Sequence, residues 1–168
     1  MISKYIFLAI TFAFICLDLF SQPELKFKEN QSLTWKETIE YYRYLDEKHP
    51  EALLMEVGLT DVGKPLHLFL ISDNELFTPE LVRDNNKSIL LINNGIHPGE
   101  PCGIDASVHF AEEILSNQDK YKKLLDNVVI GIVPVSNIGG ALNRGEYHRA
   151  NQNGPVEHGF RGNATNMD

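Results

Sequence analysis

The segment SILLINNGIHPGEPCGID, residues 88–105, decides the fold that the sequence predicts. It opens with an apolar run between polar clusters, which is typical of a strand buried on both faces. From Ile104 to Leu115, apolar residues recur at helical spacing, and Pro101 suits the first position of that helix. A second apolar run, NVVIGIVP at residues 127–134, predicts another buried strand. A strand, a helix and a strand in this order predict a parallel sheet with covered faces.

The residues before this segment predict a helix and a β-hairpin. Thr34 and Glu37 have the spacing of a capping box, and apolar residues recur at helical spacing from Trp35 to Leu45. Two short apolar runs, ALLMEVGLT and PLHLFLIS, flank the sequence DVGK. A glycine in such a short polar connection favours a hairpin turn.

From Ser136 to Asp168 the chain is rich in Gly, Asn, Arg and His and has almost no apolar periodicity. This composition predicts a long loop, and so long a loop in a compact domain is usually functional. The sequence ends inside this loop without a closing strand or helix. We therefore expect a fold that is incomplete at the C-terminus, the first portion of a longer domain.

Composition and charge favour an ordinary globular domain. Hydrophobic residues make up 43% and charged residues 23% of the chain, and the formal net charge is -8. Domains that bind nucleic acid usually carry a basic face, so we expect no nucleic-acid partner.

The first residues have the pattern of an export signal. Lys4 precedes an apolar run over residues 5–17, which is shorter than the about 20 residues of a membrane span. The polar stretch after it predicts cleavage after Ser21, which divides the chain into a signal peptide, residues 1–21, and a mature domain, residues 22–168. An uncleaved membrane anchor is the alternative. The expected location is secreted or periplasmic, with no stable membrane insertion after signal removal.

His97 and Glu100 lie in the turn between the first buried strand and its helix, where open α/β sheets place ligand sites. An imidazole and a carboxylate suit Zn²⁺, which in catalytic sites often takes two His, one Glu and a water. Pro98 and Pro101 would restrict the backbone around both side chains. A bare H-x-x-E is a weak signal, because the same spacing recurs at His109 inside the predicted helix, where no metal is needed.

Cys102 is the single cysteine of the predicted mature domain, so no internal disulfide is expected. A nucleophilic thiol is one interpretation, but no base-and-orienter set stands beside it in the sequence. Packing at the start of the helix is the other interpretation.

Taken in combination, these segments resemble the M14 family of zinc metallocarboxypeptidases. GIHPGEPCG resembles the first zinc motif of that family, and IVPVSNIGGALNR resembles its next strand and the Asn-rich loop that follows. YHRANQNGPVEHGFRGNATNMD is similar to the stretch that leads into the family's D-x-N-R segment. The resemblance covers residues 33–168 and implies an α/β/α sandwich around a mixed, mostly parallel sheet. It also implies an exported zinc-dependent carboxypeptidase that hydrolyses peptide or protein substrates.

The resemblance implies specific roles for residues of this chain. His97 and Glu100 fall at zinc-ligand positions of the family. Arg149 falls where the family has an arginine that polarises the scissile carbonyl, and Arg161 is the competing candidate. Asp168 falls where an aspartate hydrogen-bonds the first zinc histidine, which orients that ligand.

Other parts of the family's site are expected after Asp168. These are a third zinc ligand, which is a histidine, a glutamate general base and an Asn-Arg pair for the substrate carboxylate. His158 is the one spare histidine that could act as a substitute ligand. Two other functions remain open: a non-catalytic exported binding module on the same scaffold, and a related zinc deacylase of acylated amino acids. The loop LNRGEYHRANQNGP favours the peptidase branch. Without the downstream residues, we expect the 168-residue chain itself to be inactive.

Overall fold

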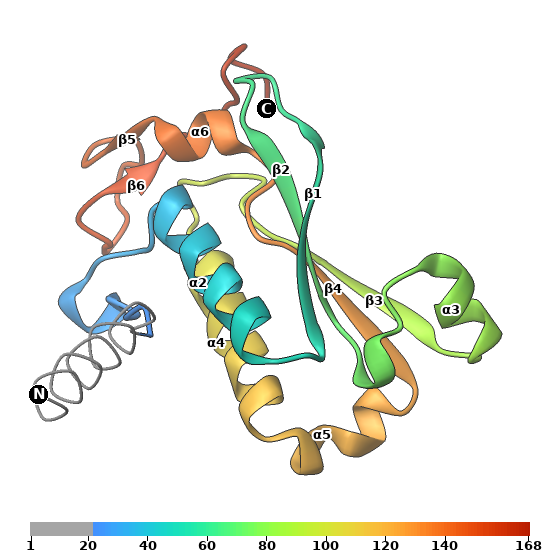
Figure 1. Cartoon of the computed structure of the whole chain (residues 1–168). Helices are drawn as coiled ribbons and strands as arrows, with labels where there is room; N and C mark the ends of the chain where they lie inside the picture. The colour runs from blue at the N-terminus through green and yellow to red at the C-terminus, as the bar shows by residue number, and fades with distance from the viewer. Residues whose placement is uncertain (1–21) are drawn as a thin grey trace, which may run out of the picture.

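The structure is a computed structural model that describes residues 22–168. The predicted signal peptide lies outside the described residues. Residues 22–168 form a mixed sheet with flanking helices (Figure 1). This confirms the expected fold class.

The first long helix is α2 (Trp35–Lys48), and it begins as the sequence predicts. The Thr34 side chain accepts a hydrogen bond from the backbone N–H of Glu37, and the Glu37 carboxylate accepts one from the backbone N–H of Thr34. This reciprocal capping box satisfies two backbone donors that no helical carbonyl can reach. The helix ends at Lys48, shortly before Pro50.

The sheet has four strands in the order β1-β2-β4-β3. Their bounds are β1 (Ala52–Leu59), β2 (Pro65–Ile71), β3 (Ser88–Asn93) and β4 (Val128–Val133). β1 and β2 form the predicted antiparallel hairpin, β2 also pairs antiparallel with β4, and β3 pairs in parallel with β4. Gly63 adopts φ 66° in the hairpin turn, a conformation that glycine adopts readily. The parallel pair is the one predicted from the strand–helix–strand pattern.

The main core lies between one face of the sheet and two helices, α2 and α4 (Cys102–Ser116). The rings of Tyr42 and Phe69 pack at a tilt of 49° with centroids 4.7 Å apart, and Val108 and Ile130 are fully buried in the same cluster. A further helix, α5 (Gln118–Leu125), leads from α4 into β4 and contributes Leu125 to this core. Burial of these large apolar side chains is the main force that holds the helices on the sheet.

The other face of the sheet is covered only in part. The short helix α3 (Pro79–Asp84) packs Val82 against Val129, which points away from the main core because side chains alternate along a strand. Ile89 and Leu91 of β3 are 58% and 61% exposed. The prediction that the first apolar strand is buried on both faces is therefore wrong for the described residues. The reason is position: β3 lies at the edge of the sheet, and the one helix over this face is six residues long.

The segment after β4 is more ordered than the predicted long loop. It contains the short helix α6 (Ile138–Leu142) and a two-stranded ladder of β5 (Arg144–Gly145) and β6 (His158–Gly159). Gly140 allows the close approach of this segment to itself, since a Cβ there would lie 2.4 Å from the backbone oxygen of Phe160. None of the helices in residues 22–168 is long and apolar enough to cross a membrane.

Candidate metal centre

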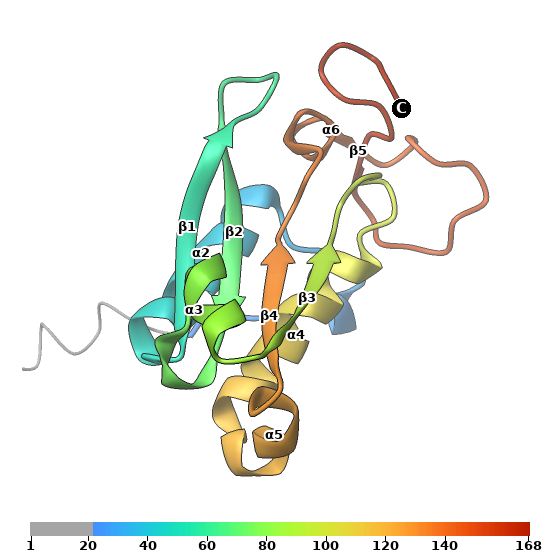
Figure 2. The same cartoon turned by 90° about the vertical axis from the view of Figure 1, so that its right-hand side faces the viewer.

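The candidate site lies where the carboxyl ends of β3 and β4 point to the same end of the sheet (Figure 2). The loops after both strands are tied together by backbone and side-chain hydrogen bonds. The backbone N–H of Ser136 donates to the backbone oxygen of Asn94 at 2.9 Å, and the Ser136 hydroxyl reaches Asn93 Oδ1 at 2.6 Å. The loop that carries His97 therefore starts from a rigid base.

The loop from residue 94 to residue 101 makes two sharp turns. Gly95 adopts φ 61°, and a Cβ there would approach Val135 Cγ1 to 3.0 Å. The backbone N–H of Glu100 donates to the backbone oxygen of His97 at 2.8 Å, which closes the second turn. The turn brings the two side chains to the same side, so that His97 Nδ1 and Glu100 Oε2 are 3.8 Å apart.

Asp168 contacts the other nitrogen of the His97 ring. The distance from His97 Nε2 to Asp168 Oδ1 is 2.8 Å, within hydrogen-bond range. A proton on Nε2 would leave the lone pair of Nδ1 directed toward Glu100. A carboxylate in this position fixes the tautomer and the orientation of a histidine ligand.

Two arginines share the same carboxylates. Arg149 Nη1 pairs with Glu100 Oε1, and Arg161 Nη1 lies 3.7 Å from the same oxygen. Arg161 Nε also donates to Asp168 Oδ2 at 2.7 Å. The hydrogen bond from Arg149 holds the pKa of Glu100 below its ordinary value, and the hydrogen bond from Arg161 does the same for the pKa of Asp168. At neutral pH both carboxylates are therefore ionised, so they can accept hydrogen bonds but cannot donate them.

The residues fit a zinc ion as two of its ligands. Zinc bonds to imidazole nitrogen and carboxylate oxygen are about 2.0–2.2 Å long, and two such bonds can meet across the 3.8 Å between His97 Nδ1 and Glu100 Oε2. Across residues 22–168, no group of three or more His, Cys, Asp or Glu side chains could hold a metal ion. The described part of the chain thus brings together one imidazole and one carboxylate with the chemistry of zinc ligands.

Asn137 is a residue of the site that the sequence did not single out. Its side-chain oxygen accepts from the backbone N–H of Gly140 at 2.8 Å, so it caps α6. Its amide nitrogen donates to the backbone oxygens of Arg161, at 2.9 Å, and of Ile96, at 3.3 Å. One side chain thus joins the loop of His97 to the loop of Arg161. An asparagine shortly after a buried strand and just before two glycines was the available signal.

Among residues 22–168, no other candidate of the sequence joins this pair to make a group of three metal ligands. His109 is exposed on α4, and His158 is buried on β6, where its ring packs edge-on against His148 with centroids 6.1 Å apart. Cys102 is exposed at the first position of α4, so the interpretation as a packed residue is wrong. The Cys102 side chain therefore does not belong to the core.

A sequence model of the Peptidase_M14 family, described as zinc carboxypeptidase, matches residues 38–166. The chain belongs to this family. Its helices and strands, the loop of His97 and the C-terminal loop all fall within or beside the matched range. Members of this family are zinc enzymes that act on peptides. No curated protein matches the chain at a significant level.

Solved carboxypeptidase-like structures share the fold of this M14 chain. The structure of bovine thrombin-activatable fibrinolysis inhibitor in complex with tick carboxypeptidase inhibitor has a TM-score of 0.54 and 20% identity, over 67% of this chain and 33% of that chain. Carboxypeptidase A from Helicoverpa armigera has a TM-score of 0.55 and 20% identity, over 66% of this chain and 26% of that chain. At this identity the likeness shows the fold alone. The M14 chain spans a third or less of the length of these two structures.

Proposed function

We propose that the protein is an exported zinc-dependent metallocarboxypeptidase that removes residues from the C-terminus of peptides. The observation that supports this most is the joint geometry of His97, Glu100 and Asp168 at the end of a parallel strand in an M14 chain. His97 Nδ1 and Glu100 would hold the metal. When bound, zinc supplies Lewis-acid polarisation and a water of lowered pKa for attack on a peptide carbonyl.

The chain's own residues would prepare that chemistry. Asp168 keeps the proton on His97 Nε2 and so presents Nδ1 as a ligand. Arg149 stands beside Glu100, where its guanidinium would face the oxygen that becomes negative during attack. Arg161 stands on the other side of the same carboxylate and remains the alternative for this role.

A working site needs more groups than the described residues supply. Catalytic zinc usually has three protein ligands, and proton transfer needs a general base. Residues 22–168 supply the two ligands His97 and Glu100. The third ligand and the general base must therefore come from outside these residues if the function is correct.

Metal dependence of peptide hydrolysis tests this function. We expect the complete protein to release free C-terminal amino acids from peptides, to lose this activity with a chelator and to regain it with added zinc. Glu100→Gln should abolish both the tight zinc binding and the turnover. A folded complete protein that binds no zinc and cleaves no peptide would instead support a non-catalytic binding module. Release of acyl groups from acylated amino acids, without peptide cleavage, would support a deacylase.

Export has a separate test. We expect the protein recovered from the periplasm or the medium to begin at Gln22. Mass spectrometry that shows an intact Met1 would contradict the predicted signal peptide.

A further inference from the structure

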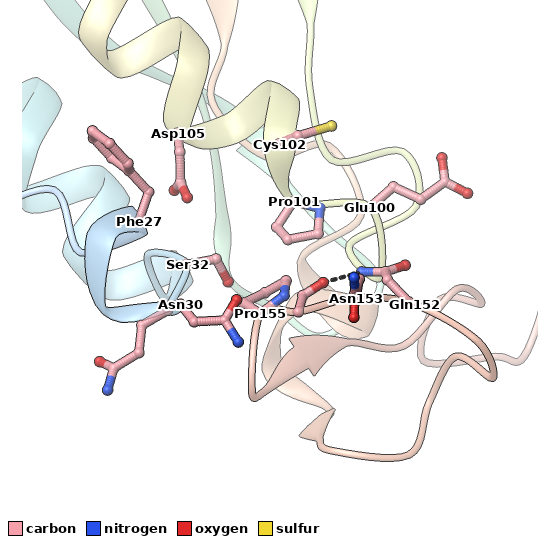
Figure 3. A pocket seen from close by; sticks show the side chains of 12 residues that line it. Phe27, Asn30, Ser32, Glu100, Pro101, Cys102, Asp105, Gln152, Asn153 and Pro155 are labelled. Carbon is pink, nitrogen blue, oxygen red and sulfur yellow. Dashed lines mark hydrogen bonds between the residues drawn. The ribbon is translucent and has the colours of Figure 1, made fainter.

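A cavity of about 470 Å³ opens between the start of α4, the N-terminal segment and the loop that precedes β6, and Glu100 of the candidate metal centre belongs to its lining. Figure 3 shows Phe27 at one end of this cavity and Glu100 at the other, with Asp105 extending from α4 between them. We call it the amide pocket, because carboxamide side chains are frequent in its lining. Its volume lies in the range of sites that bind small molecules. The lining residues that matter here are Phe27, Asn30, Gln31, Asp105 and Asn153.

The two walls of the amide pocket are fastened to each other. The backbone N–H of Val156 donates to the backbone oxygen of Asn30 at 2.8 Å, which joins the N-terminal segment to the loop that precedes β6. Behind this wall, Arg144 Nη2 donates to Ser32 Oγ at 3.2 Å and to the backbone oxygen of Glu157 at 2.9 Å. A ligand therefore meets a formed cavity and does not have to order it.

Gly154 leaves room for this arrangement. Its φ is 81°, and a Cβ at this position would lie 1.9 Å from Asn30 Oδ1. Any side chain there would displace Asn30 from the wall. Residue 154 thus combines a positive φ with a close approach to the Asn30 side chain, and only glycine permits both.

The lining offers hydrogen bonds without positive charge. Among the described residues that line the cavity there is no Lys, Arg or His, which disfavours phosphate and carboxylate ligands. Within residues 22–168, the side chains of Asn30, Gln31 and Asn153 make no hydrogen bond to another residue, so their donors and acceptors are available to a ligand. Asp105 accepts one hydrogen bond, from the backbone N–H of Leu33 at 3.1 Å, and has further lone pairs for hydroxyl or amide donors.

Phe27 adds an apolar surface to these polar groups. Its side chain is 59% exposed, and the segment of residues 27–29 buries none of its members. An aromatic ring presents a negative face that attracts C–H groups of positive partial charge. A ring next to carboxamides and a carboxylate matches a molecule with one C–H face and many hydroxyl groups around its edge.

We propose that the amide pocket binds a neutral sugar, and that the substrate is a glycopeptide whose sugar lies near the cleaved bond. The substrate assignment rests on the proposed peptidase function, because Glu100 is shared by the cavity and the candidate zinc pair. Asp105 accepts from sugar hydroxyls, Phe27 stacks on the ring, and the carboxamides pair with an acetamido substituent. An N-acetylated sugar therefore binds more tightly than its plain hydroxyl analogue.

Binding of simple sugars tests the pocket without any need for activity. The probes are methyl β-N-acetylglucosaminide and methyl β-glucoside, titrated into the protein while the backbone amide signals of Asn30 and Asn153 are followed by NMR. We expect saturable shifts with a dissociation constant of about 1 mM for the N-acetylated sugar. Phe27→Ala should weaken binding roughly fivefold. Asp105→Asn, which keeps the acceptor for Leu33, should weaken it about tenfold.

Two matched variants and a sugar-free probe complete the test. Leu59→Ala removes an exposed apolar side chain from β1, and Asp119→Asn changes a carboxylate in the first turn of α5; both should bind as the parent does. No saturable shift with either sugar, or equal affinities in Phe27→Ala and Leu59→Ala, would overturn the sugar site. Shifts with acetyl-trialanine but not with the sugars would overturn it in favour of a peptide subsite.

Two further probes, N-acetylglucosaminyl-asparagine and N-acetylmuramoyl-alanine, distinguish the two possible sources of the sugar. The first represents a glycoprotein and the second a cell-wall glycopeptide, and the tighter one identifies the substrate class. Sugar binding in a protein that binds no zinc would leave the pocket intact and would refute the peptidase. Zinc-dependent cleavage of plain peptides without sugar binding would support the peptidase function and would refute the sugar site.

Discussion

His97 and Glu100 stand three residues apart on a loop, and His109 and Glu112 stand three residues apart on α4. In the loop pair, His97 Nδ1 and Glu100 Oε2 are 3.8 Å apart. Asp168, Arg149 and Arg161 contact this pair. On α4, His109 is exposed, and Glu112 accepts a hydrogen bond from the Tyr41 hydroxyl at 2.8 Å. The same three-residue spacing thus occurs in a candidate metal site on the loop and in a helix-packing contact on α4.

The difference lies in what surrounds each pair. Helical geometry alone explains why residues three apart on α4 share a face, so their proximity is not evidence of a functional site. On the loop, the turn at Glu100 and the contact with Asp168 hold two side chains that would otherwise be free. Ordering side chains costs entropy, so an ordered pair with charged neighbours is the stronger sign of function.

The largest effect should come from removing one histidine of each pair. In the complete protein, His97→Ala should weaken zinc binding by at least about 100-fold, since two remaining ligands hold the metal poorly. His109→Ala should leave it unchanged. Competition with a chromophoric chelator measures both. Equal losses would show that the surroundings of the two pairs do not matter.

The arginines beside the loop pair should affect turnover more than metal binding. Arg149→Ala should lower kcat by roughly 10²–10³-fold with unchanged zinc content, as expected for a lost donor to a developing oxyanion. Arg161→Ala is the matched comparison, because Arg161 also contacts Glu100. If Arg161→Ala shows the large loss and Arg149→Ala does not, the two residues exchange roles.

A smaller effect is expected at the carboxylate that orients His97. Asp168→Asn keeps the shape of the side chain but removes the charge, and should weaken zinc binding by about 10–100-fold. Asp126→Asn is the control, since Asp126 pairs with Lys122 on the surface of the molecule. Normal zinc affinity in Asp168→Asn would mean that the 2.8 Å contact does not orient the ligand.

Removing the acid of the α4 pair should change stability and leave zinc unaffected. Glu112→Gln replaces a charged acceptor of the Tyr41 hydroxyl by a neutral one, and we expect a loss of about 1 kcal/mol in the free energy of unfolding. Glu113→Gln should cost less, because Glu113 pairs with an exposed Lys120. Urea unfolding measures both variants. A loss of zinc in Glu112→Gln would break the contrast between the two pairs.

The last prediction concerns a third glutamate, Glu37, and how its carboxylate makes the stability of the folded state depend on pH. Burial opposes the charged form, but the Lys26 ammonium, the Thr34 backbone N–H and the Thr34 hydroxyl together lower the pKa of Glu37 from 4.5 to about 2. A lowered pKa stabilises the folded state above pH 4.5, and this contribution is lost as the pH falls toward 2. Glu37→Gln should therefore flatten the acid dependence of unfolding between these values. An unchanged slope would place the carboxylate outside the capping box in solution.

Much of the fold could be predicted because its signals are local. The Thr34 cap, the stripe from Ile104 to Leu115 and the hairpin turn at Gly63 depend on residues a few positions apart. The exposure of β3 could not be read from SILLIN, because an apolar strand looks the same whether both its faces are covered or one is open. The helix α3 was not predicted either, since six residues carry too little periodicity to stand out.

For the candidate site, the sequence by itself determined the two side chains His97 and Glu100 and the stiff turn that carries them. The prolines, the glycines and the end of the strand that shape this turn all lie within about ten residues of one another, so their effect is local. The meeting with Arg149, Arg161 and Asp168 was decided by the tertiary structure alone. Those residues belong to a segment without periodicity, and its path is set by contacts between distant residues. Asn137 joins the loop of His97 to the loop of Arg161, and Gly140 lets the chain pass against its own backbone. Contacts of this kind form only once the sheet has brought the ends of β3 and β4 to the same place.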